Sequence, residues 1–131
     1  MNQTDLDVMA RTIYGEARGE SRDGMIAVAW VIKNRSDNPG WWGNGVADVC
    51  RKPWQFSCWN ENDPNRQKLT NVTIEDPRFR DCLMVTAGVL SGNYEDNTGG
   101  SNHYCTKNLD PKWSIGEQPV AYVGNHKFYK L

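Results

Sequence analysis

The sequence predicts a mainly α-helical α+β fold with a short β-hairpin near the C-terminal end. In the first 35 residues, one segment carries apolar residues at helical spacing and a second is apolar at every position from Met25 to Ile32; a further segment with helical spacing follows an Asp-Pro pair. Residues 120–129 instead show strand-forming residues on both sides of a Gly-Asn turn signal. A chain of 131 residues is long enough for one hydrophobic core and too short for two, so we expect a single domain over residues 1–131.

The first helix is expected to begin at Thr4, because Asp7 three residues later resembles a capping box. Its buried face is predicted from apolar residues at helical spacing: Leu6, Met9, Ala10, Ile13 and Ala17. Gly15 and Gly19 both weaken a helix, which predicts an end near Glu16.

A second helix is expected over residues 22–34. Every position from Met25 to Ile32 is apolar, which is typical of a helix that is buried on all sides. We therefore expect this helix to lie at the centre of the core, with Trp30 as one of its core residues.

Residues 36–71 lack periodicity and are interrupted by Gly and Pro, which leaves room only for a short helix near residues 46–50. Long irregular segments in compact domains tend to be functional. This one carries four of the six tryptophans, and we expect it to form one wall of a cleft: Trp41, Trp42, Trp54 and Trp59.

In the second half of the chain, Asp76-Pro77 is typical of an N-cap followed by proline at the first helical position. The helix that follows should end at Gly92 and act as scaffold. Residues 97–100 are then expected to form a turn into residues 101–105, and the final hairpin should turn near Gly124-Asn125.

Composition excludes several classes of function. The formal net charge is −1 and the pI about 6.1, so the chain has no basic surface for nucleic acid or for binding a wall or membrane by charge alone. No segment approaches the roughly 18 apolar residues of a membrane span, and residues 1–5 lack the features of a signal peptide. We expect a monomer that is not inserted in a membrane and has no signal peptide.

The four cysteines are Cys50, Cys58, Cys82 and Cys105. Without a leader for export, free buried thiols are expected, and a Cys50–Cys58 bridge is the alternative. Neither the cysteine spacing nor the two distant histidines resembles a metal site, so we expect no metal and no cofactor.

Glu16 is the candidate catalytic residue. It lies where the apolar face of the first helix meets a glycine-bounded turn, so its carboxyl is expected to be partly desolvated, which favours the protonated form. A protonated carboxyl can act as the general acid that glycosidic bond cleavage requires. Six Trp and five Tyr suit the apolar faces of sugar rings, although aromatic residues equally fill small cores.

Three segments together resemble the SleB/CwlJ-type cell wall hydrolases. The first is Ala10–Glu20, followed by Gly24 and Ala27–Arg35; the second is Gln55–Trp59; the third comprises Asn102–Tyr104, Pro111–Trp113 and Val123–Tyr129. The resemblance implies a lysozyme-like fold, related to goose-type lysozyme and lytic transglycosylases. It further implies cleavage of the peptidoglycan glycan strand between N-acetylmuramic acid and N-acetylglucosamine, with Glu16 matching the acid of the Gly-Glu-Ala-Arg-Gly-Glu motif. Family members usually carry an export signal or a wall-binding repeat, and a chain without either would fit a phage endolysin that a holin releases from the cytoplasm to the cell wall.

Two outcomes of the cleavage stay open. Attack by the sugar's own 6-hydroxyl needs Glu16 alone, as acid and then base, and the resemblance to lytic transglycosylases favours this route. Attack by water in an inverting muramidase needs a second carboxylate about 6.5–9.5 Å away. The candidates are Glu20, Asp23, Glu61 and Asp63. Glu20 would share a face with Glu16 only if the helix continued past Gly19, and a solvated or Arg18-paired Glu20 is the preferred interpretation.

Around Glu16 we place five candidate substrate-binding residues: Gln55, Ser57, Trp59, His103 and Tyr104. Tyr104 could donate a hydrogen bond to Glu16 or to an N-acetyl carbonyl, and His126 is expected to be structural. Two alternatives belong to other classes of protein. One is a cysteine peptidase of the stem peptides, with Cys58 as nucleophile and His103 or His126 as base; the other is a non-catalytic glycan-binding module.

Overall fold

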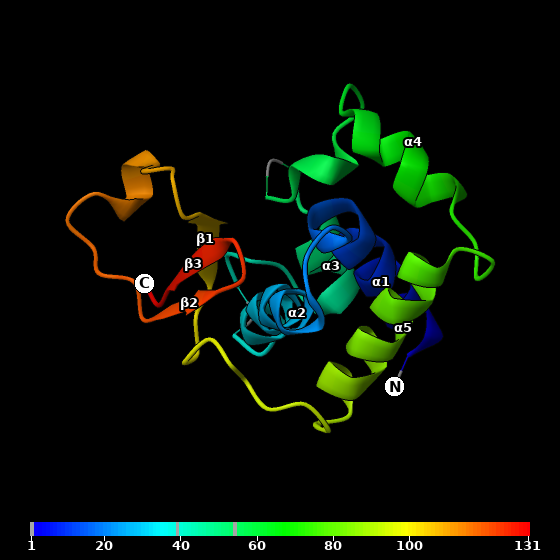
Figure 1. Cartoon of the computed structure of the whole chain (residues 1–131), viewed down its shortest axis with the longest axis horizontal. Helices are drawn as coiled ribbons and strands as arrows, with labels where there is room; N and C mark the ends of the chain where they lie inside the picture. Colours follow the sequence, from blue (N-terminus) through cyan, green and yellow to red (C-terminus); the bar gives the residue numbers. More distant parts are fainter. Residues whose placement is uncertain (1, 39, 54) are drawn as a thin grey trace.

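The computed structural model describes residues 2–38, 40–53 and 55–131, so the expectation for Trp54 lies outside the described residues. Three long helices, α1 (Gln3–Ala17), α2 (Arg22–Ser36) and α5 (Pro77–Leu90), form the body of the molecule, and α3 (Val46–Arg51) and α4 (Pro64–Asn71) pack on α1 (Figure 1). Two short 3₁₀ helices, η1 (Ser57–Trp59) and η2 (Lys112–Ser114), interrupt the loops. A small sheet of β1 (His103–Thr106), β2 (Ala121–Val123) and β3 (His126–Tyr129) lies on the other side of α2.

The N-terminus of α1 differs from the expectation. The helix is capped by Asn2, whose Oδ1 accepts hydrogen bonds from the backbone N–H groups of Thr4 (2.7 Å) and Asp5 (3.3 Å). A capping box at Thr4 was therefore wrong, and Asp7 instead pairs with Arg11 on the helix surface at 3.1 Å. The C-terminus was predicted to within one residue, since α1 ends at Ala17.

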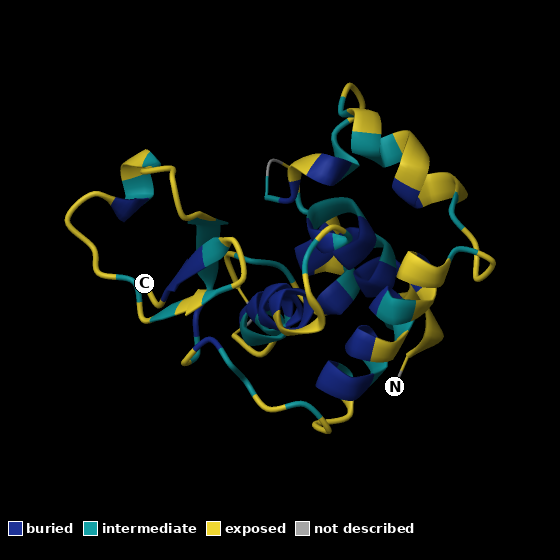
Figure 2. Ribbon diagram, viewed as in Figure 1, coloured by how far each residue is buried: buried dark blue, intermediate teal, exposed yellow. Residues whose placement is uncertain are grey.

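α2 is the central helix, as predicted (Figure 2). One side packs among α1 and α5, and the other side places Ala27 and Val31 against Phe128 of β3. Trp30 is only half-buried, because its indole reaches the edge of the core and its Nε1 donates to the Tyr94 carbonyl at 3.1 Å. Because its two faces contact different layers, α2 joins the helical body to the sheet.

Sequence analysis missed α4 in the segment between residues 36 and 71. Its only fully buried residue is Leu69, so it shows little apolar periodicity. The available signal was Asp63-Pro64, which repeats the Asp-Pro start of α5: the Asp63 carboxylate accepts from the Asn65 N–H at 2.8 Å. Arg11 then ties the end of α4 to α1 by donating to the carbonyl oxygens of Leu69 (2.7 Å) and Val72 (2.9 Å).

The predicted C-terminal hairpin is present as β2 and β3, and it turns at Gly124, whose φ is +57°. β1 was not predicted as a strand. It pairs antiparallel with β3, with Tyr104 opposite Phe128, so the sheet order is β1-β3-β2. This pairing brings the His103-Tyr104 segment next to α2.

All four cysteines are free in the structure, so the alternative Cys50–Cys58 bridge is not formed. Cys50, Cys58 and Cys82 are buried as expected, whereas Cys105 on β1 is partly exposed. Among the described residues, no helix is both long and apolar enough to cross a membrane.

Candidate active site

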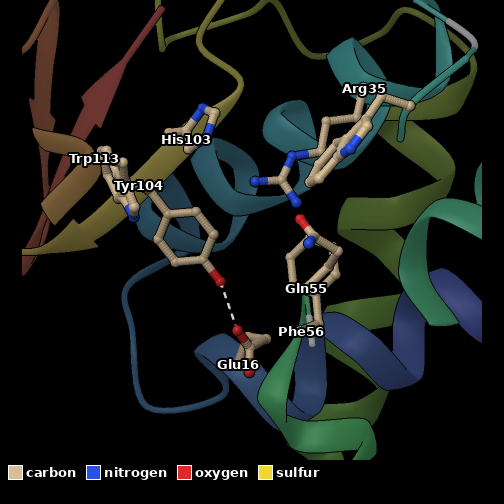
Figure 3. Close-up of a pocket in the computed structure, with 8 residues that line it drawn as sticks. Glu16, Arg35, Gln55, Phe56, His103, Tyr104 and Trp113 are labelled. Atoms are coloured by element: carbon tan, nitrogen blue, oxygen red, sulfur yellow. Dashed lines mark hydrogen bonds between the residues drawn. The ribbon is translucent and has the colours of Figure 1, made fainter. Parts of the chain in front are cut away.

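A pocket of about 350 Å³ opens between the helical body and the sheet (Figure 3). Its lining comes from five parts of the chain that are far apart in sequence: Glu16, Arg35, Trp41, Gln55, Phe56, His103, Tyr104 and Trp113. Glu16 comes from the last turn of α1, and Tyr104 reaches it from β1. The pocket therefore forms only when the sheet packs on the helices.

Glu16 and Tyr104 are joined directly. The Tyr104 hydroxyl donates to Glu16 Oε1 at 2.7 Å, as Figure 3 shows. Burial, together with the neighbouring carboxylate, raises the pKa of Tyr104 well above its usual value. The phenol therefore keeps its proton at neutral pH and acts as a fixed donor to the Glu16 carboxylate.

Glu16 is the only carboxylate among the described residues that line this pocket. The Glu20 carboxylate instead accepts from Asn125 N (3.0 Å) and Nδ2 (2.9 Å), and its Oε1 lies 3.3 Å from His126 Nδ1. Arg18 does not pair with Glu20; it donates to the Tyr14 carbonyl and to Asn65.

The other three candidates for a second carboxylate also lie outside the lining. Asp63 caps α4, and Glu61 is exposed, 3.8 Å from Arg66. Asp23 is exposed in the first turn of α2. The pocket thus presents a single carboxylate to a ligand.

His103 lies in an aromatic wall of the pocket, with its ring centroid 4.8 Å from that of Trp113 and 5.2 Å from that of Trp42. Burial and the positive charge of Arg35 lower the pKa of His103 to about 4. Its ring is therefore neutral at neutral pH and has no proton to deliver as an acid. His126 lies between the Glu20 carboxylate and the Tyr104 ring and does not line the pocket, which agrees with the structural role that we expected for it.

The three candidate substrate-binding residues from the loop lie in different places. Gln55 lines the pocket, but Ser57 is exposed outside the lining. Trp59 turns away and donates from Nε1 to Thr12 Oγ1 at 2.9 Å. Trp59 lines a second pocket beside α4, together with Arg51 and Arg66.

Sequence reasoning missed Arg35, Phe56 and Trp113 as pocket residues. The segments that carry the family resemblance contain all three, but nothing in their spacing shows which side chains face a cavity. For Arg35, the sequence does not show that the side chain is buried, because this burial depends on the packing of β1 on α2.

Cys58 does not line the pocket. Its Sγ is buried 4.0 Å from the Thr12 carbonyl, and burial, followed by the nearby Glu16 charge, raises the pKa of the thiol. A nucleophilic cysteine needs surroundings that favour the thiolate, and these do the opposite. The geometry therefore argues against a Cys58 peptidase.

Comparisons with known proteins match this chain to a cell wall hydrolase family and to spore cortex-lytic enzymes. A family model described as Cell Wall Hydrolase matches residues 19–129, a span that begins three residues after Glu16. The chain is 43% identical to a spore cortex-lytic enzyme of Oceanobacillus iheyensis over 98% of its own length and 42% of that protein. It is 29% identical to the spore cortex-lytic enzyme of Halalkalibacterium halodurans, over 97% and 35%. The chain thus spans less than half the length of these curated relatives.

Two solved structures share the fold. The catalytic domain of the germination-specific lytic transglycosylase SleB from Bacillus anthracis superposes with a TM-score of 0.78, at 27% identity, over 99% of this chain and 97% of that one. The catalytic domain of the Bacillus cereus SleB protein gives a TM-score of 0.74 at 27% identity, over 99% and 92%. The lysozyme-like fold that the resemblance implied is thereby confirmed.

Proposed function

This chain belongs to the cell wall hydrolase family, and we propose that it cleaves the peptidoglycan glycan strand between N-acetylmuramic acid and N-acetylglucosamine. The proposal rests on one observation above all: a single carboxylate, Glu16, faces the pocket and is held there by the Tyr104 hydroxyl at 2.7 Å. The names of the relatives support the same class of substrate, since they are spore cortex-lytic enzymes and a lytic transglycosylase.

In the proposed reaction, Glu16 donates its proton to the glycosidic oxygen as the bond to C1 of the muramoyl residue breaks. The resulting carboxylate then takes the proton of the 6-hydroxyl of the same muramoyl residue. The oxygen of that hydroxyl bonds to C1, which gives a 1,6-anhydro end. One residue serves as acid and then as base, and no water is consumed. Tyr104 supports the carboxylate in the charged half of this cycle, because a hydrogen bond to the charged form stabilises it.

A lytic transglycosylase is favoured over an inverting muramidase by the positions of the other carboxylates. An inverting mechanism needs a base that activates water on the opposite face of the sugar. Glu20 was the nearest such candidate in sequence, but its carboxylate is directed to Asn125 and His126. We also propose that the enzyme acts as a monomer, since the described residues of a single chain bring Glu16, Gln55 and Tyr104 together in one pocket.

The test is mass spectrometry of the muropeptides that the protein and its Glu16→Gln variant release from purified peptidoglycan. We expect 1,6-anhydro-muramoyl ends from the wild type and at least a 100-fold slower release from the variant, because glutamine has no proton to deliver. Asp23→Asn is a matched control, since that carboxylate is exposed on α2. Reducing ends one water heavier would mean a hydrolase, and equal release by Glu16→Gln would refute the role of Glu16.

A further inference from the structure

Arg35 is a buried cation in the pocket that the proposed chemistry leaves without a role. It lies in the last turn of α2 with only 6% of its surface exposed, yet it lines the same pocket as Glu16. Figure 3 shows its guanidinium group beside Gln55 and at the opposite end of the labelled cluster from Glu16.

The protein holds the guanidinium plane but uses little of its hydrogen-bonding capacity. Nε donates to the Asn102 carbonyl at 2.8 Å, and the central carbon lies 4.1 Å from the ring centroid of Trp42 and 5.2 Å from that of Phe56. Nη1 is buried and has no hydrogen-bond partner among the described residues. A guanidinium has five N–H donors, and Nε is the one nitrogen of Arg35 that donates a hydrogen bond to a described residue, so most of this planar donor group has no acceptor in the protein beside the cavity that Arg35 lines.

The positive charge of Arg35 is also not paired with a carboxylate of a described residue. None of the ion pairs between described residues includes it. Burial lowers the pKa of Arg35 to about 10, although Tyr104, Cys50 and Glu16 act in the opposite direction, so the side chain is charged at neutral pH. A buried charged donor without an acceptor is costly, which favours the arrival of an acceptor with the ligand.

We infer that Arg35 binds the substrate by donating to a carbonyl oxygen on the C2 or C3 substituent of the muramoyl residue whose bond Glu16 breaks. This inference rests on the proposed function. Glu16 must reach the bridging oxygen at C1, so a side chain at the other end of the pocket meets a substituent of the ring. An arginine side chain only donates hydrogen bonds, and a carbonyl oxygen only accepts them. A carbonyl oxygen is therefore a better partner for Arg35 than a sugar hydroxyl, which both donates and accepts. The acetamido group at C2 and the lactyl amide at C3 each carry such an oxygen.

The experiment measures ligand affinity in the Glu16→Gln background, where the ligand is not cut. Three tetrasaccharides of equal length separate the sources of the carbonyl: cellotetraose has neither, chitotetraose has only the C2 acetamido group, and a glycan tetrasaccharide with peptide stems has both. Arg35→Lys keeps the charge and the aliphatic stem but removes the planar fork. Arg22→Lys, an exposed arginine at the other end of α2, is the matched control.

We expect Arg35→Lys to weaken binding of the stem-bearing tetrasaccharide about 10- to 100-fold, which is typical of losing hydrogen bonds from a charged group. Affinity for cellotetraose should not change. An equal loss with chitotetraose would assign the contact to C2, and no loss with chitotetraose would assign it to C3. Equal losses with all three sugars, or no loss with any, would overturn the inference.

A second measurement on the unaltered arginine covers the case in which Arg35→Lys does not fold. The NMR signals of the Arg35 guanidinium nitrogens should shift on adding the stem-bearing tetrasaccharide and stay in place with cellotetraose; no shift with either would refute the contact. Neither measurement depends on cleavage. Failure of the proposed function would appear separately, as unchanged muropeptide release by Glu16→Gln.

Discussion

At the scale of single residues, three groups near Glu16 are each held in one protonation state by their surroundings. The phenol of Tyr104 keeps its proton because burial and Glu16 raise its pKa, and the ring of His103 stays neutral because burial and Arg35 lower its pKa to about 4. The thiol of Cys58 is buried in surroundings that disfavour the thiolate. In the proposed reaction, Glu16 is therefore the pocket residue to which we assign both proton transfers.

Tyr104→Phe tests the support that the hydroxyl gives to Glu16. Removing the donor leaves a carboxylate that is less stabilised just after it has delivered its proton, so we expect kcat to fall about 10-fold with KM nearly unchanged. Tyr122→Phe, a change at an exposed tyrosine of β2, should leave both constants as they are. Steady-state release of muropeptides measures this, and a raised KM with normal kcat would mean that Tyr104 binds substrate and does not act on Glu16.

At the scale of elements, the predicted end of α1 was nearly correct, but the role that the prediction gave to Gly15 was wrong. Gly15 was interpreted as a residue that weakens the helix, yet it lies inside α1. A Cβ atom there would come within 2.7 Å of Cys58 Cβ and 2.8 Å of Leu69 Cδ2, both on fully buried residues. Glycine therefore permits η1 and α4 to pack closely on the turn that carries Glu16.

Gly15→Ala should destabilise the protein despite the better helix propensity of alanine. Propensity contributes up to about 1 kcal/mol in favour of alanine, whereas overpacking a tight core contact costs about 1–3 kcal/mol. We expect a net loss of about 1–2 kcal/mol in the free energy of unfolding, measured by urea denaturation, together with lower activity because Glu16 is displaced.

Gly19→Ala is the matched control, because a Cβ atom at Gly19 meets nothing within 4 Å. We expect it to change the free energy of unfolding by less than about 0.5 kcal/mol. If Gly15→Ala proved as stable as the wild type, the close approach of η1 and α4 would not explain the glycine.

At the scale of the whole molecule, local patterns predicted the elements, and contacts between distant segments decided what the patterns could not show. The apolar run of α2 identified the central helix, and the Gly-Asn turn identified the hairpin. β1 has no clear pattern of its own and exists because it pairs with β3.

In the candidate site, too, local motifs predicted some residues, and contacts between distant segments decided the others. Glu16, Gln55, His103 and Tyr104 all reach the pocket as expected from their motifs. Arg35 escaped notice because only the packing of β1 on α2 reveals that its charge is buried beside the cavity. Ser57 and Trp59 belong to the same motif as Gln55, but η1 turns them away from it.

Glu20 joins the two parts of the molecule, since its carboxylate links the start of α2 to the turn between β2 and β3. Its side chain is about 10% exposed and accepts two hydrogen bonds from Asn125. Burial alone would raise the pKa of Glu20, but the bonds from Asn125 and the proximity of His126 outweigh it and lower the pKa below its usual 4.5. A carboxylate with a lowered pKa in the folded state stabilises the fold above the unfolded-state pKa, and this contribution disappears as the pH falls through the folded-state value.

Glu20→Gln should therefore reduce the free energy of unfolding at pH 7 by about 1–2 kcal/mol, because the hydrogen bonds lose their charge assistance. The difference from the wild type should shrink as the pH falls below the usual 4.5 and through the lowered folded-state pKa of Glu20, because Glu20 of the wild type then becomes protonated as well. Urea denaturation at pH 7 and over a series of acidic pH values measures this, with Glu117→Gln at an exposed glutamate as control. The muropeptide products should be the same as those of the wild type. Loss of cleavage in a variant that still folds as stably as the wild type would instead make Glu20 the second carboxylate of a hydrolase, and the sheet would then be held on α2 by its packing alone.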